Sequence, residues 1–237
     1  MNTEQPGALV IGAGPAGLMA AETLTGQGAH VVVAEAMPTP ARKFLMAGKS
    51  GLNLTKDESP ADFAARFSGA LPRTPGYLGM KEFGPAEVMD WARGLGVELF
   101  TGSTGRGFPV GMKASPLLRA WLGRLAGQGV ELRTRWRWSG FDGTGWRFAT
   151  PLGDEVLRPD VVVLALGGAS WPRLGSDAAW LPWLAAKGVE IAPFRPANMG
   201  FRVDWSAPMA RHFGQAVKGV ALSAGDLVSR GEWVVTA

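Results

Sequence analysis

Six consecutive residues near the N-terminus, Gly12-Ala13-Gly14-Pro15-Ala16-Gly17, have the types and spacing of a phosphate-binding turn. Glycine at the first position permits a tight turn, at the third it lets the backbone approach a pyrophosphate, and at the sixth it lets a helix pack closely on a strand. Glu35 follows roughly 20 residues later, where a carboxylate accepts hydrogen bonds from ribose hydroxyls and repels a 2′-phosphate. We therefore predict that Gly12, Ala13, Gly14, Pro15, Ala16, Gly17 and Glu35 bind the ADP half of FAD or NAD, and not NADP.

The elements around this turn are those that such a site requires. Ala8–Ile11 is a short apolar run that predicts a buried parallel strand, and apolar residues recur at helical spacing from Pro15 to Gly26. Val31–Ala34 predicts a second buried strand, which places Glu35 at its carboxyl end. The helix start then presents free N–H groups and a partial positive charge to phosphates. A purely structural glycine turn would not need this order of strand, turn, helix, strand and acid.

The composition excludes several other kinds of site. The chain has no cysteine and only two histidines, His30 and His212, so we expect no disulfide, no redox-active dithiol and no metal site. A net charge of +4 suits ligands that carry phosphates or carboxylates.

The N-terminal apolar run follows Glu4, lacks a basic region and is interrupted by glycines, which argues against a signal peptide or membrane span. We expect a soluble cytoplasmic protein, and no pattern specifies an oligomeric state.

The rest of the chain predicts further α/β structure. The segment 37–62 has a loop composition, and from 193 onward the sequence becomes polar and turn-rich, which indicates a new β-rich domain. Between them we expect helices over Ala61–Phe67, Pro85–Leu95, Ser115–Gly127 (with Ser115 as the N-cap) and Asp177–Lys187, and strands over Val130–Phe141, Trp146–Thr150 and Val161–Leu166.

Three arginines alternate with aromatic residues in the predicted strand Val130–Phe141. Arg133, Arg135 and Arg137 would share one face, with Trp136 and Trp138 on the other. Such a strand could stack bases and bind nucleic-acid phosphates. Ordinary sheet patterning favours an amphipathic edge strand with packed tryptophans and solvated arginines, so nucleic acid is a disfavoured partner. His212 could act as an acid or base, although an isolated surface histidine is the favoured interpretation.

Several longer motifs in this sequence are similar to those of one bacterial flavoprotein family. They are Arg42–Leu45, Gly105–Val110, Lys113–Ser115, Gly167–Pro172, Gly175-Ser176 and Arg195–Ala197. Members of that family are known as NAD(FAD)-utilising dehydrogenases or aminoacetone-oxidase-like FAD-binding enzymes. The run that ends at Leu166-Gly167 also resembles a second flavoprotein signature, in which a buried strand returns beside the nucleotide. By itself that run fits an ordinary strand-to-turn junction equally well.

The resemblance implies an α/β fold: a Rossmann-like, glutathione-reductase-type FAD-binding domain of three layers over residues 1–193. Residues 194–237 would begin an inserted β-rich substrate domain, and the chain would end inside it. The family's Gly-Gly-Gly-Arg-Cys-Asn-Val-Thr loop stands here as Gly48–Thr55, without the arginine and the cysteine, as expected of a divergent subfamily. The resemblance adds Arg42, Lys43, Asn53, Leu166 and Gly167 to the expected FAD-binding residues, and no side chain qualifies as catalytic.

Three functions are compatible with the sequence. The first is an FAD-dependent oxidoreductase that transfers hydride at flavin N5 between a nicotinamide cofactor, NADH or NADPH, and a small organic substrate. The second is a truncated, non-catalytic nucleotide-binding fragment. The third is a nucleic-acid-associated flavoprotein that uses the arginines of Val130–Phe141.

Overall fold

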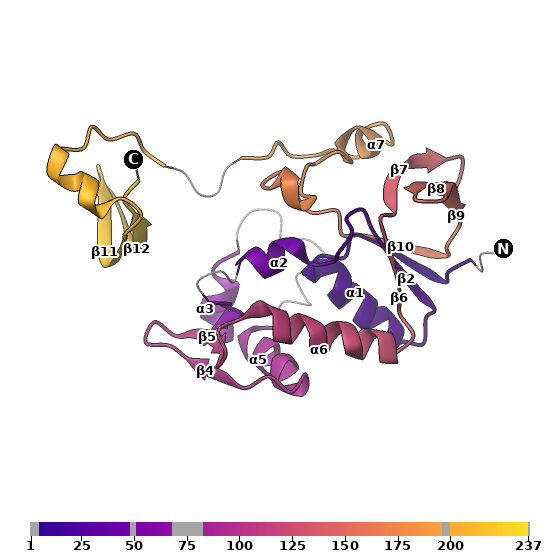
Figure 1. The fold of residues 1–237 in the computed structure, drawn as a ribbon, viewed down its shortest axis with the longest axis horizontal. Helices are drawn as coiled ribbons and strands as arrows, with labels where there is room; N and C mark the ends of the chain where they lie inside the picture. The colour runs from indigo at the N-terminus through magenta and orange to yellow at the C-terminus, as the bar shows by residue number, and fades with distance from the viewer. Residues whose placement is uncertain (1–4, 48–50, 68–82, 196–199, 237) are drawn as a thin grey trace. The chain divides into compact units, whose positions relative to one another are not determined.

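A computed structural model describes residues 5–47, 51–67, 83–195 and 200–236 (Figure 1). The chain divides into two compact units, Met1–Phe194 and Arg195–Ala237. The second unit contains the 3-10 helix η3 (Ala207–His212) and an antiparallel hairpin of β11 (Ala216–Ala224) and β12 (Leu227–Val234). That it begins an inserted substrate domain stays a prediction.

A four-stranded parallel sheet forms the centre of the first unit. Its order is β10 (Val161–Leu164), β1 (Ala8–Ile11), β2 (Val31–Glu35) and β6 (Glu131–Thr134). The apolar runs of β1 and β2 are buried on both faces, as parallel strands covered on two sides must be. Helix α1 (Pro15–Gly26) makes the crossover between them, which confirms the predicted strand, turn, helix and strand.

Helices cover one face of this sheet. Side chains of α1 and of α6 (Ala114–Gly127), among them Leu18 and Trp121, pack on Val10 and Val33. Glu22 on α1 joins these helices to α5 (Pro85–Gly94). Its carboxylate accepts hydrogen bonds from the indole N–H groups of α5 and α6 tryptophans, at 3.2 and 2.6 Å, and from an α6 arginine at 2.9 Å; these donors are Trp91, Trp121 and Arg124.

An antiparallel sheet covers the opposite face. It consists of β7 (Arg137–Asp142), β8 (Gly145–Thr150) and β9 (Gly153–Leu157), in that order. Its buried Trp138, Phe148 and Leu157 pack on Leu9 and Val32 of the parallel sheet. Helices, parallel sheet and antiparallel sheet therefore form the three layers that were predicted, and the predicted hairpin arm Trp146–Thr150 is confirmed as β8.

The predicted strand Val130–Phe141 is wrong, because the chain changes layer within it. Strand β6 ends at Thr134, Arg135 has a positive φ of 59°, and β7 then begins in the other sheet. Arg133 bonds to Glu131 at 2.8 and 2.9 Å and its guanidinium lies over the Trp136 ring. The three arginines do not share a face, which removes the geometric basis of the nucleic-acid hypothesis.

Other predicted bounds also need correction. The segment 37–62 is not all loop, because it contains α2 (Arg42–Ala47), β3 (Thr55–Lys56) and the start of α3 (Pro60–Ala64). Helix α6 begins at Ala114, so Lys113 and not Ser115 is its N-cap, and α7 (Leu181–Ala185) is shorter than predicted. Strand β3 joins β5 (Arg106–Pro109) and β4 (Leu99–Thr101) in a small antiparallel sheet, and η2 (Pro172–Leu174) is a 3-10 turn.

Candidate functional site

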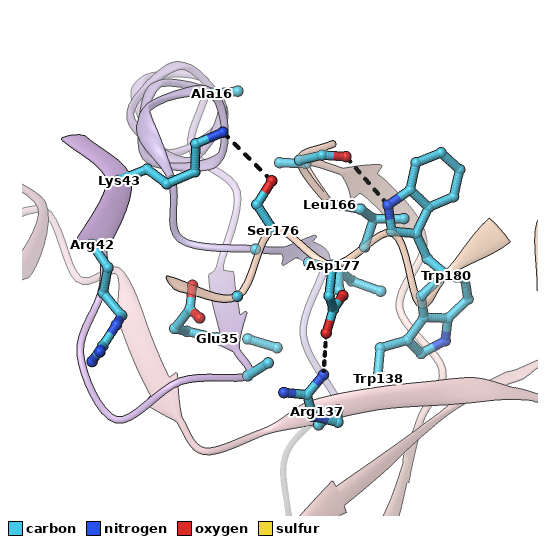
Figure 2. Close-up of a pocket in the computed structure, with 18 of the residues that line it drawn as sticks. Ala16, Glu35, Arg42, Lys43, Arg137, Trp138, Leu166, Ser176, Asp177 and Trp180 are labelled. Carbon is cyan, nitrogen blue, oxygen red and sulfur yellow. Dashed lines mark hydrogen bonds and ion pairs between the residues drawn. The ribbon is translucent and has the colours of Figure 1, made fainter. Parts of the chain in front are cut away.

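A cleft of about 750 Å³ opens at the carboxyl ends of β1, β2 and β10 (Figure 2). This is the edge at which open α/β sheets bind ligands, and the size falls within the range of small-molecule sites. Nine of the predicted cofactor-binding residues line the cleft: Gly12, Gly14, Pro15, Ala16, Glu35, Arg42, Lys43, Leu166 and Gly167. Segments far apart in the sequence therefore meet where the motifs predicted a nucleotide site.

The three glycines of the turn differ in what a side chain at each position would contact. Gly12 has a φ of +104°, and a Cβ there would overlap the carbonyl oxygen of Ala165, the residue that follows β10. A Cβ at Gly17 would overlap the carbonyl oxygen of Gly12, so this glycine sets how closely α1 approaches the sheet. A Cβ at Gly14 would meet no protein atom within 4 Å. Protein packing therefore does not require glycine at position 14, whereas close approach of a ligand to the backbone would.

Glu35 ends β2 with its carboxylate beside the glycine turn. One oxygen, Oε2, accepts the N–H of Ala13 at 2.9 Å, and Oε1 accepts the N–H of Met37 at 2.8 Å. The side chain thus ties the turn to β2 while it lines the cleft, and further lone pairs on the two oxygens can accept ribose hydroxyls. Ala13 itself is buried and does not line the cleft, although its N–H fixes the orientation of Glu35.

Helix α2 brings two cations to the cleft. The N–H of Ala41, just before the helix, donates to the carbonyl of Ala13 at 2.8 Å, which anchors the helix start to the glycine turn. Arg42 donates from Nη1 to Thr39 at 3.2 Å, and its buried Nε has no hydrogen-bond partner among the described residues. Lys43 reaches across the cleft to the segment after β10 (Figure 2).

Apart from Leu166 and Gly167, the opposite wall was not predicted as part of the site. It comes from β7 and from the segment between β10 and α7, and its lining residues include Trp138, Trp180, Arg137, Asp177 and Ser176. Arg137 and Asp177 form an ion pair at 3.5 Å, and Trp180 donates its indole N–H to the Gly167 carbonyl at 3.2 Å. The motif Gly175-Ser176 marked part of this wall, but no spacing in the sequence links it to β7.

Besides Ala13, two further predicted residues lie outside the cleft. Gly17 is buried on the face of α1 that packs against the glycine turn, and it supports the turn without lining the cavity. Asn53 is exposed beside the buried Leu52 and is not among the lining residues. The expected approach of the loop 48–55 to a flavin stays a prediction, and residues 48–50 lie outside the described part of the chain.

The described residues contain neither a metal-binding cluster nor a membrane-spanning helix. No group of three or more His, Cys, Asp or Glu side chains is placed to hold a metal ion within the part of the chain that the structure describes. Across those same residues, no helix combines the length and apolar character needed to span a bilayer.

The three layers, the glycine turn and the acid at the end of β2 define a Rossmann-type dinucleotide-binding domain. The chain belongs to the HI0933-like family: the family model described as "HI0933-like protein Rossmann domain" matches residues 6–228. This membership confirms the flavoprotein family inferred from the motifs. No curated protein matches the chain.

Solved structures with the same fold include the 3-ketosteroid-delta4-(5alpha)-dehydrogenase from Rhodococcus jostii RHA1. That structure has a TM-score of 0.56 and 18% identity, and the match covers 80% of this chain and 56% of that one. Thermovibrio ammonificans THI4 has a TM-score of 0.49 and 15% identity, over 78% of this chain and 64% of that one. The chain therefore spans less than two thirds of either structure.

Proposed function

We propose that the cleft binds FAD through its ADP half. The observation that carries this proposal is the pairing of an unobstructed Gly14 backbone with the Glu35 carboxylate on the same cleft. The N–H groups at the start of α1 suit the pyrophosphate, and Glu35 suits the ribose hydroxyls. Arg42 also lines the cleft and adds a positive charge beside them.

The protein of which this chain is part would be an FAD-dependent oxidoreductase. Bound flavin supplies hydride transfer, here between NADH or NADPH and a small organic substrate. Residues of this chain would bind and orient the cofactor, and none is proposed as a catalytic acid or base. Family membership supports the redox assignment, and the structural neighbour from Rhodococcus jostii RHA1 is itself a dehydrogenase.

The test is the visible absorption spectrum of the purified chain before and after incubation with FAD, followed by gel filtration. We expect flavin bands to remain with the protein after FAD but not after FMN, which lacks the ADP half. Loss of all flavin after FAD would contradict the proposal. Where FAD is retained, anaerobic addition of NADH and of NADPH measures bleaching of the flavin band. Retention without bleaching by either donor would favour the nucleotide-binding fragment over the oxidoreductase.

A further inference from the structure

Lys43 carries a positive charge that no carboxylate of the described residues neutralises. Its ammonium donates to two neutral hydroxyls, Ser170 Oγ at 2.9 Å and Ser176 Oγ at 3.5 Å. An ammonium has three N–H donors, so one remains for another partner. Because Lys43 lines the same cleft as Gly14 and Ala16, that partner would come from the ligand.

Ser176 is built to accept a hydrogen bond from Lys43. It is 4% exposed, and its hydroxyl donates to the Gly168 carbonyl at 2.9 Å. Because the single hydroxyl proton of Ser176 is donated to that carbonyl, Oγ can act only as a hydrogen-bond acceptor toward the cleft. Such a group attracts a cation and repels an anion, so Ser176 suits the holding of Lys43 and does not suit direct contact with a phosphate.

The segment that carries Ser176 is fixed relative to the nucleotide turn. Backbone hydrogen bonds between Trp171 and Ser176 close it into a small loop. A Cβ at Gly175 would lie 2.9 Å from Cγ of Met37, the residue whose N–H is held by Glu35. The loop therefore packs against the end of β2, and Ser176 is a fixed point to which the flexible lysine is attached.

We propose that Ser176, with Ser170, is a positioning residue that holds the Lys43 ammonium over the start of α1 as the countercharge for a pyrophosphate. The inference rests on the proposed function, since the anion it assigns is the pyrophosphate of FAD. It adds two residues that no motif assigned to the cofactor. Lys43 is the group that touches the phosphate, and the serines act through it.

The experiment measures affinities for FAD, ADP and adenosine by titration at two salt concentrations. Lys43→Met keeps the unbranched apolar stem of the side chain and removes the ammonium, so FAD and ADP should bind about 10- to 100-fold more weakly, the range of a hydrogen bond to a charged group. Adenosine has no phosphate and should bind unchanged. The affinity of the variant for ADP should also depend less on salt, because a charge contact has been removed. Lys113→Met, an equal charge change at an exposed lysine outside the cleft, is the control.

A double-mutant cycle separates positioning from mere support of the loop. Ser176→Ala should weaken ADP binding about 3- to 10-fold in the wild-type background and leave it unchanged in Lys43→Met. An equal loss in both backgrounds would mean that the hydroxyl serves only the Gly168 carbonyl, and would overturn the inference. Ser139→Ala, which removes a hydroxyl bonded to the Arg147 carbonyl away from the cleft, controls for general loosening.

The two levels of the proposal fail in different ways. A wild-type chain that binds neither FAD nor ADP would overturn the proposed function, and the inference with it. A wild-type chain that binds both, with Lys43→Met binding ADP equally well, would overturn the inference alone.

Discussion

Two alanine substitutions in the glycine turn should have opposite consequences for folding and for binding. Gly17→Ala places a Cβ on the Gly12 carbonyl, 3.0 Å from its carbon and 3.2 Å from Cβ of Ala165, so the helix must move away from the sheet. Gly14→Ala places a Cβ in open space, at φ −77° and ψ 179°, a conformation that alanine adopts freely. The first change should therefore unfold the protein more readily, and the second should affect only the ligand.

The size of each effect follows from these contacts. Overpacking against backbone should cost about 3 kcal/mol, the upper end of the usual range, for Gly17→Ala. For a chain of this length that cost lowers the Tm by roughly 6–12 °C. Gly14→Ala should lose a few tenths of a kcal/mol because alanine is a poorer N-cap than glycine. It should gain about as much stability because alanine restricts the unfolded chain. The Tm of this variant should therefore stay within about 2 °C of the wild-type value. Its FAD affinity should fall about 10- to 100-fold as backbone donors lose the pyrophosphate.

The assay combines thermal unfolding of the ligand-free chain, followed by tryptophan fluorescence, with FAD titration of each folded variant. Gly26→Ala is the matched control, because it lies in the same helix with no atom within 4 Å of its Cβ. It should stabilise the helix by up to about 1 kcal/mol and leave FAD binding unchanged. Undiminished FAD affinity in Gly14→Ala would refute the assignment of the pyrophosphate to this turn, and an unchanged Tm in Gly17→Ala would refute the packing argument.

Three further predictions concern side chains outside the turn. Glu22→Ala should lower the free energy of unfolding by about 3 kcal/mol in urea titrations, because one cation and two indoles lose a largely buried acceptor. The hydrogen bond from Arg133 lowers the pKa of Glu131 below its ordinary value of 4.5, so the pair stabilises the fold above that pH and is lost on further acidification. Glu131→Gln should therefore flatten the stability profile below about pH 4.5, by less than about 1 kcal/mol because the glutamate is half exposed. Asp177→Asn should change stability by less than about 1 kcal/mol in the same titration, since its pair with Arg137 is long and solvent-accessible.

The first half of the site was predictable because its signals are local. The turn and Glu35 lie within one strand, helix and strand unit, where apolar periodicity and glycine spacing determine both the elements and their order. The same locality explains the correct prediction of α1 and of the hairpin arm at β8. Lys43 was predicted only through the resemblance, since nothing in its own segment indicates that α2 is anchored to the Ala13 carbonyl.

The wall formed by β7 and by the segment between β10 and α7 was missed, because its position depends on which sheet each strand enters. The alternation of Val130–Phe141 fits one strand, and only the positive φ at Arg135 sends its second half to another sheet. That change of layer brings Trp138 and Arg137 to the cleft, opposite Asp177 and Trp180. Hydroxyl and indole hydrogen bonds to the turn at Gly167 are likewise tertiary, so Ser176 carried no site signal beyond its place in a family motif.

Strand order explains why the two halves meet. The chain goes from β1 to β2 on one side, and much later returns as β10 on the other side of β1. The strand order therefore reverses beside β1, and open α/β sheets bind ligands in the crevice outside the carboxyl ends of the strands at such a switch point. The glycine turn occupies that end, with Glu35 on one flank and Leu166 and Gly167 on the other. The cleft is therefore a consequence of topology, and under the proposed function the side chains around it would decide which nucleotide it accepts.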